Sequence, residues 1–141
     1  MRNLKLLSSS LEETDLFAKK FASTLKKGDI VAFFGELGSG KTTFLKSLIS
    51  ALNHTSQEEI HSPTFTYLHI YEGPIPVYHF DLYRLKGAQD FIDLGFHEFF
   101  GKDGICCIEW SEKIKEILPS GTIQVHLSHI GETSRSIEVL S

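Results

Sequence analysis

The stretch GELGSGKT at residues 35–42 decides the fold predicted for this chain. It fits the pattern G-x-x-x-x-G-K-[ST], whose glycines let the backbone turn tightly and bring N–H groups against phosphate oxygens. Lys41 supplies a positive charge for the β- and γ-phosphates of a nucleotide, and Thr42 supplies a hydroxyl for Mg²⁺. The segment therefore predicts a phosphate-binding loop.

The residues on either side of the loop support this prediction. The run IVAFF at residues 30–34 is continuously apolar, which is typical of a strand buried on both faces. Apolar residues then recur at helical spacing at Phe44, Leu45, Leu48, Ile49 and Leu52. Strand, glycine loop and helix is the order that the motif requires, because the helix presents its positive N-terminal end to the phosphates. The alternative, a glycine-rich surface turn, needs no such flanks.

Composition limits the class of protein. The chain has 141 residues, enough for one domain with a real core, so we expect a single nucleotide-binding domain over residues 1–141. Its 14 basic and 18 acidic residues give a net charge of −4, with no cluster of Lys and Arg, which argues against an autonomous nucleic-acid binder. No apolar stretch approaches 18 residues, so we expect a cytoplasmic protein with neither membrane nor DNA as partner. The adjacent Cys106 and Cys107 are expected to be buried thiols.

The remaining pattern predicts an α/β fold. A short strand at residues 4–7 precedes a helix that Ser10 and Glu13 open as a capping box and that ends at Gly28. Strands at residues 65–71 and 77–80 flank the turn at 73–76 as a hairpin, and two short helical pieces occupy residues 87–100. A second buried strand follows at residues 105–108, then a helix capped by Ser111 that runs to Leu118, and a C-terminal hairpin at one edge. We expect a P-loop NTPase-like sheet, parallel at its centre and antiparallel at its edges, with helices on both faces.

Two acids stand where a magnesium ligand is expected. Asp81 follows the run VYHF and Glu109 follows ICCI, so each is predicted at the carboxyl end of a strand, where ligands of open α/β sheets bind. A phosphate loop needs a carboxylate there to position Mg²⁺. The residues leave open which acid touches the metal, and a helix cap or a surface charge is the alternative for each. We therefore assign both to the site.

Other residues are weaker candidates. Ser62 and Thr64 lie after the P-loop helix, where nucleotide switches keep a hydroxyl that senses the γ-phosphate. Arg84 could stabilise transferred charge, and His79 could orient water or substrate. The alternatives are a salt bridge at a strand edge for Arg84 and a half-buried ring for His79. Trp110 could stack on a base or anchor a partner, and it could equally be a core residue.

Four segments together resemble a known family. GELGSGKTT, SPTFTY, HFDLYRL and IEW, in this order within a short chain, resemble the bacterial TsaE (YjeE) family. The resemblance implies an ATPase subunit of the machinery that makes the N6-threonylcarbamoyl modification on the adenosine beside the anticodon of certain tRNAs. It implies two partners, a threonylcarbamoyltransferase (TsaD) and its paralogue (TsaB), with tRNA reached through the complex. ATP hydrolysis would reset that complex between turnovers.

The resemblance also implies roles for individual residues. Thr42 and Glu109 would bind Mg²⁺, with Asp81 in the second acidic position. The segments around Ser10 and Glu132 would form the adenine pocket. The nucleotide would contact the loop and the start of its helix at Gly35, Leu37, Gly38, Ser39, Gly40, Lys41, Thr42 and Thr43. Together with the candidates from the residues themselves, the candidate catalytic residues are Lys41, Asp81, Glu109, Thr64, Arg84 and His79.

The sequence shows no arginine finger placed at the γ-phosphate, and in related NTPases a missing finger costs about 10³ to 10⁵ in rate. We therefore expect slow hydrolysis that a partner accelerates. A small-molecule kinase is the main alternative, but it needs an Arg-rich lid, and no Arg occurs between Leu85 and Pro119. A GTPase is disfavoured because N-K-x-D and D-x-x-G are missing from the sequence. A binding module that ATP only shapes, without hydrolysis, remains the third alternative.

Overall fold

The computed structural model describes residues 3–35, 41–60, 66–130 and 134–141. Its strands are β1 (Asn3–Ser8), β2 (Ile30–Phe34), β3 (Leu68–Tyr71), β4 (Val77–Asp81), β5 (Ile105–Glu109), β6 (Ile123–Ile130) and β7 (Ser134–Leu140). Its α-helices are α1 (Leu11–Ala22), α2 (Lys41–Asn53) and α3 (Ala88–Asp93). Its 3-10 helices are η1 (Gln57–Glu59), η2 (Phe96–Phe99) and η3 (Ser111–Ile117).

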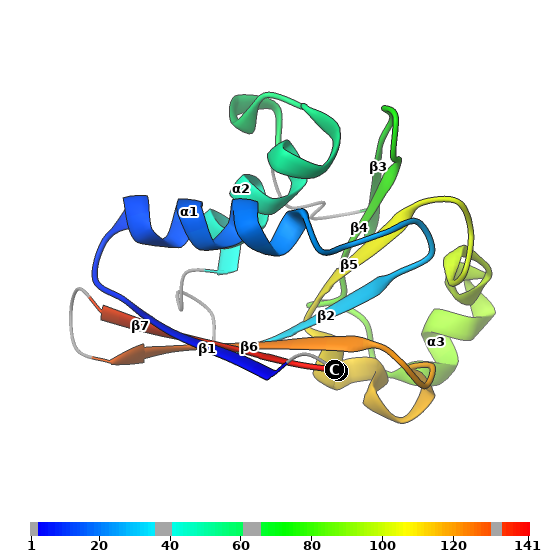
Figure 1. The fold of residues 1–141 in the computed structure, drawn as a ribbon. Coiled ribbons are helices and arrows are strands. Elements are labelled where there is room, and N and C mark those ends of the chain that lie inside the picture. Colours follow the sequence, from blue (N-terminus) through cyan, green and yellow to red (C-terminus); the bar gives the residue numbers. More distant parts are fainter. Residues whose placement is uncertain (1–2, 36–40, 61–65, 131–133) are drawn as a thin grey trace.

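The strands form one seven-stranded sheet in the order β1-β7-β6-β2-β5-β4-β3 (Figure 1). The four central strands are parallel, because β2 pairs in parallel with β5 and β6 and β4 pairs in parallel with β5. β3 joins β4 antiparallel at one edge, and β7 and β1 continue antiparallel from β6 at the other. This confirms the predicted sheet, parallel at the centre and antiparallel at its margins.

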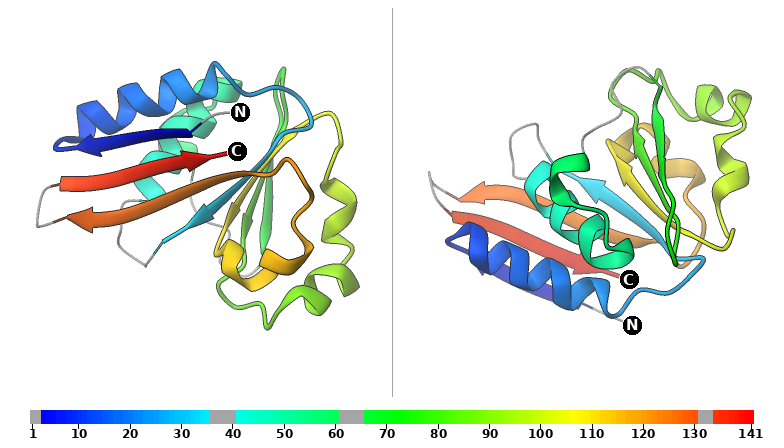
Figure 2. Two further views of the ribbon diagram at one scale, coloured as in Figure 1. Left: turned by 60° about the horizontal axis from the view of Figure 1, so that its bottom comes forward. Right: turned by 90° about the horizontal axis from the view of Figure 1, so that it is seen from above.

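Helices cover both faces of the sheet, as predicted. α1 and α2 lie on one face, and α3 lies with η3 toward the other (Figure 2). Alternate side chains of β2 point to opposite faces of the sheet. Val31 and Phe33 pack in the cluster under α1 and α2, whereas Ile30 packs in the cluster on the other face. Phe44 of α2 fixes the first cluster, with its ring 5.9 Å from that of Phe33 and 6.3 Å from that of Phe21 on α1. α2 is thereby held directly over the strand that precedes it.

The first helix begins as predicted and ends earlier. The Ser10 hydroxyl accepts a hydrogen bond from the N–H of Glu13 at 3.1 Å, which confirms the cap. Glu13 Oε2 accepts from the N–H of Ser9, and not from that of Ser10 as in a capping box. The helix ends at Ala22 and not at Gly28, because the chain closes a local turn in which the N–H of Lys26 donates to Asp29 Oδ2 at 2.9 Å. Phe17 and Phe21 lie within the helix, and Leu25, which follows its end, packs in the same cluster.

Three further predictions need correction. β3 begins at Leu68 and not at Phe65. Thr66 and Tyr67 lie before the strand, and Phe65 lies outside the described residues. Ser111 does not cap an α-helix: its hydroxyl donates to the carbonyl of Ile108 at 2.8 Å, and the segment forms the 3-10 helix η3, kinked inside. The C-terminal hairpin is not the margin of the sheet, because β1 pairs outside β7.

Within the described ranges, no helix combines the length and apolar character needed to cross a membrane.

Candidate functional site

The site begins where β2 ends. Gly35 follows the strand with φ of 150°, a backbone conformation that L side chains rarely adopt, and α2 starts at Lys41. The described chain therefore has the predicted strand before the loop and the predicted helix after it. Leu37, Gly38, Ser39 and Gly40 lie outside the described residues, as do the side chains of Lys41 and Thr42.

The two predicted acids stand side by side on neighbouring strands. Asp81 is the register partner of Glu109 in the parallel β4–β5 pair, so both lie at the carboxyl ends of their strands. β5 is also the direct neighbour of β2, whose carboxyl end leads into the loop. Both acids are in phase with Val77 and Cys107, which pack under α1 and α2, so their side chains project toward the face of the sheet that α2 covers. Both acids thus lie at the carboxyl ends of their strands, as the sequence predicted, and the sheet turns them toward the face that α2 covers.

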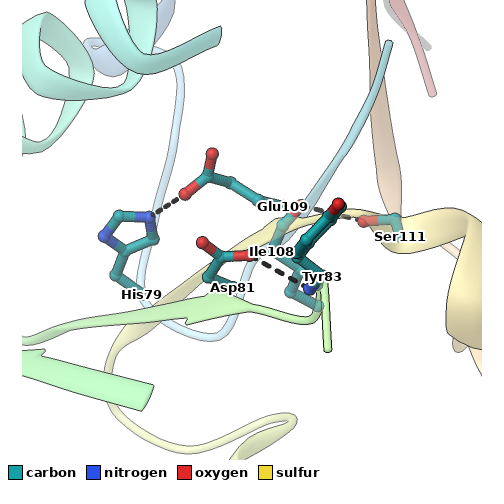
Figure 3. Close-up of polar contacts among 6 residues, drawn as sticks. All are labelled: His79, Asp81, Tyr83, Ile108, Glu109 and Ser111. Atoms are coloured by element: carbon teal, nitrogen blue, oxygen red, sulfur yellow. Dashed lines mark hydrogen bonds and ion pairs between the residues drawn. The ribbon is translucent and has the colours of Figure 1, made fainter. Parts of the chain in front are cut away.

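The environments of the two acids differ. Glu109 is buried, with 4% of its surface exposed, and its Oε2 lies 2.8 Å from Nε2 of His79, which is 2% exposed (Figure 3). Asp81 is half-buried and is tied to its own chain, since its Oδ1 accepts the N–H of Tyr83 at 3.1 Å. A buried charge requires hydrogen-bond partners. Glu109 finds one in the ring on the adjacent strand, whereas Asp81 belongs to a local turn of the backbone.

The chain turns sharply after each acid. Trp110 adopts a left-handed conformation with φ of 61°, and its ring lies 4.9 Å from that of Tyr83, an exposed residue two positions after β4. The carbonyl of Glu109 accepts the N–H of Leu82 at 3.2 Å, which ties the two turns together. Both carboxylates are consequently carried on backbone fixed by hydrogen bonds between neighbouring segments.

The other predicted residues are spread around this core. Ser10 caps α1, and Arg84 is exposed three residues after Asp81. Thr43 lines an open hollow of about 330 Å³ between α1 and α2. Ser62, Thr64 and Glu132 lie outside the described residues.

The hollow contains a residue that the sequence prediction missed. Asp15 of α1 lines it together with Ser47 of α2, and hydrogen bonds from Lys19 and then Ser47 lower the pKa of Asp15 below its ordinary value. Lys19 Nζ lies 2.8 Å from Asp15 Oδ2, one helical turn along. Only this i,i+4 pairing was visible in the sequence, and it is common on exposed helix faces.

The chemistry of the acids suits a hard divalent cation. Mg²⁺ prefers oxygen ligands and keeps several waters, so one or two carboxylates next to bound phosphates meet its needs. No group of three or more His, Cys, Asp and Glu side chains able to hold a metal occurs among the residues that the structure describes. A closed site with only protein ligands is therefore not formed there, and the carboxylate pair fits a cation whose remaining ligands come from elsewhere.

The chain matches known proteins over nearly its whole length. The family model "Threonylcarbamoyl adenosine biosynthesis protein TsaE" matches residues 8–137. The chain is 38% identical over 136 residues to the tRNA threonylcarbamoyladenosine biosynthesis protein TsaE of Treponema pallidum, covering 96% of this chain and 99% of that one. It is also 38% identical over 138 residues to the protein of the same name from Bacillus subtilis, covering 97% and 85% of the two chains.

A solved structure has the same fold. The crystal structure of YdiB from Bacillus subtilis superposes with a TM-score of 0.78 at 34% identity, covering 98% of this chain and 84% of that one. The family model spans nearly the whole sheet, from the end of β1 into β7, and so includes the loop motif and both acids. Together with the relatives matched over almost their full lengths, this shows that the chain belongs to the TsaE family.

Proposed function

We propose that this protein is a Mg²⁺-dependent ATPase subunit of the machinery that makes N6-threonylcarbamoyladenosine in tRNA. The observation that carries the proposal is the register pair Asp81 and Glu109, at the carboxyl ends of β4 and β5 and beside the strand that leads into GELGSGKT. A nucleotide whose phosphates occupy that loop needs a cation at its β- and γ-phosphates and acids to hold the cation. The names of the TsaE relatives support the placement in tRNA modification.

The residues would divide the work by their chemistry. Lys41 and the loop N–H groups would hold the phosphates, while Thr42 and Glu109 would hold Mg²⁺, with Asp81 as the second acid. When bound, the ion neutralises negative charge on the phosphates that react. Ser62 and Thr64 would sense the γ-phosphate, and the neighbourhoods of Ser10 and Glu132 would receive the adenine. The whole chain would act as one nucleotide-binding unit.

The partners follow from the same proposal. A TsaD-like threonylcarbamoyltransferase and a TsaB-like paralogue would bind the protein in the cytoplasm, and tRNA would be contacted through that complex. The chain's net charge of −4 is consistent with an indirect role toward tRNA. Hydrolysis would be slow alone and faster with partners that complete or order the site, and each hydrolysis would reset the complex between turnovers.

The test is ATP hydrolysis by the purified protein, alone and then with the transferase and its paralogue. We expect a low rate that rises by about 10³-fold or more with the partners, the range that a supplied catalytic group gives related NTPases. A fast rate that ignores the partners would contradict the proposal. A rate that responds to a small-molecule acceptor would identify a kinase. Tight ATP binding with no hydrolysis in the complete complex would identify a binding module.

A further inference from the structure

His79 and Glu109 form a buried pair with one defined contact. Nε2 of His79 and Oε2 of Glu109 are 2.8 Å apart, and both side chains are shielded from water. The residues lie on adjacent strands, two positions out of register, since His79 pairs with Cys107 and Asp81 pairs with Glu109. The ring therefore meets the carboxylate diagonally across the β4–β5 pair. Figure 3 shows the two groups pointing toward each other.

The role proposed for Glu109 sets the direction of the contact. A carboxylate that ligates Mg²⁺ is ionised and only accepts hydrogen bonds, so Nε2 would donate to Glu109. The opposite nitrogen, Nδ1, is buried and has no hydrogen-bond partner in the part of the chain that the structure describes. The ring also packs on Tyr71 of β3, in a stacked arrangement with centroids 6.3 Å apart. Stacking and the strand thus set the ring, and its polar contact is the bond to Glu109.

We propose that His79 is a positioning residue, whose Nε2–H holds the Glu109 carboxylate in the orientation that receives Mg²⁺. The inference rests on the proposed function, in which Glu109 is a magnesium ligand. In metal sites, a hydrogen bond to a ligating carboxylate from a neighbouring side chain fixes its direction, and loss of such a bond typically weakens metal binding about 10- to 100-fold. His79 would act through Glu109 and would not contact the nucleotide. This role differs from the one predicted from the sequence, in which His79 orients water or substrate.

The geometry allows a matched pair of variants. In His79→Gln the side-chain amide nitrogen replaces Nε2, the nitrogen that bonds Glu109. In His79→Asn the amide nitrogen replaces Nδ1, which has no partner in the described chain. The two variants differ by one methylene group, and both keep a neutral, polar side chain. A role in metal positioning therefore predicts different results for them, whereas a general need for a polar side chain predicts similar ones.

The measurement is equilibrium binding of a fluorescent ATP analogue, first in EDTA and then over a Mg²⁺ titration. We expect all three proteins to bind the analogue equally in EDTA. His79→Asn should need about 10- to 100-fold more Mg²⁺ to reach half of the Mg²⁺-dependent change in analogue binding. The Mg²⁺ requirement of His79→Gln should stay close to that of wild type. If the asparagine variant does not fold, His79→Phe takes its place, because it keeps a ring on Tyr71 without either nitrogen.

A double variant tests whether His79 works through Glu109. In the Glu109→Gln background, His79→Asn should change the Mg²⁺ requirement no further, because the ligand that it positions is already altered. Equal Mg²⁺ requirements in wild type and His79→Asn would overturn the inference while leaving the proposed function intact. An additive effect in the double variant would also overturn it. If Mg²⁺ did not change binding of the analogue by the wild-type protein, that result would contradict the proposed function and, with it, the inference.

Discussion

Asn53, the last residue of α2, donates a hydrogen bond of 3.0 Å from Nδ2 to the carbonyl oxygen of Tyr71, the last residue of β3. Its Oδ1 accepts from the N–H of Thr55 at 3.2 Å and from the Thr55 hydroxyl at 2.7 Å. One buried amide therefore ties the end of α2 to an edge strand and to the turn that follows the helix.

Replacing Asn53 by alanine should lower the free energy of unfolding by about 1–3 kcal/mol, because the buried hydrogen bond from its Nδ2 to the Tyr71 carbonyl is lost. Urea denaturation of the two proteins measures the difference. Thr55→Val is the control: it removes only the half-buried hydroxyl bond and should cost less. An Asn53→Ala variant as stable as wild type would show that the link adds nothing to stability.

Substitutions of the two acids should impair hydrolysis, whereas substitution of Lys41 should impair nucleotide binding. Glu109→Gln and Asp81→Asn should leave ATP binding in EDTA unchanged, and they should lower Mg²⁺-dependent, partner-stimulated hydrolysis about 10²-fold or more, since a bound metal ion is worth several kcal/mol to the reaction. Lys41→Ala should weaken nucleotide binding itself. Hydrolysis and equilibrium binding, measured on the same preparations, distinguish the two effects.

Glu112→Gln is the matched control for the acids, because Glu112 is an exposed carboxylate on η3, three residues after Glu109. It should behave as wild type. Full hydrolysis in both acid variants at the site would refute the metal assignment, and a loss in Glu112→Gln would point to a surface effect shared by the acids.

Gly104 should tolerate no side chain. A Cβ there would lie 2.5 Å from the ring of Tyr78 and 2.6 Å from the carbonyl oxygen of Pro76, closer than real contacts allow. Gly104→Ala should cost about 1–3 kcal/mol, because it forces the backbone before β5 to shift. Gly87→Ala is the control, since nothing lies within 4 Å of its Cβ and its φ is extended. Thermal unfolding compares the two, and equal midpoints would contradict the expected clash.

The cysteines should be inert while the protein is folded. Burial raises the pKa of the Cys106 thiol from 9.0 to about 12, and burial raises the pKa of Cys107 further. At pH 8 only about one Cys106 thiol in 10⁴ would be ionised, so a thiol reagent should label the protein only after urea unfolds it. Rapid labelling without denaturant would contradict this.

The same shifts predict a pH dependence of stability. Both thiols stay protonated in the folded protein above pH 9.0, whereas they ionise when it unfolds. The unfolded state then binds fewer protons than the folded state, so stability should fall as the pH rises above about 9. Urea midpoints at pH 8 and pH 10 measure the fall. Replacing both cysteines by alanine should lower overall stability and reduce this dependence on pH.

The parts of the fold that followed from sequence were those with strong local patterns. The apolar runs of β2 and β5 have no polar position, so they could only be central strands, and an acid directly after such a run had to lie at the strand's carboxyl end. The sheet edge was harder to predict. Nothing local in residues 3–8 indicates that β1 pairs with β7, because that partner comes from the opposite end of the sequence.

Competing hydrogen bonds explain the other misses. Ser111 resembled a helix cap, but its hydroxyl is used by the Ile108 carbonyl, and a left-handed Trp110 leads into a 3-10 helix. The pairing of His79 with Glu109 was beyond sequence reasoning, because it depends on the register of β4 against β5. A shift of one residue in that register would have turned the carboxylate to the other face of the sheet.

The position of β1 has a consequence for how the chain is made. Asn3 pairs with Leu140 and Ser8 with Arg135, so β1 cannot pair until β7, which follows it much later in the chain, has been made. Contacts between such distant residues form slowly, since a long loop must close first. The nascent protein would therefore leave Leu6 and the backbone of β1 uncovered until β7 has been made. Protection of this stretch by a chaperone, or its aggregation, would be decided during that interval.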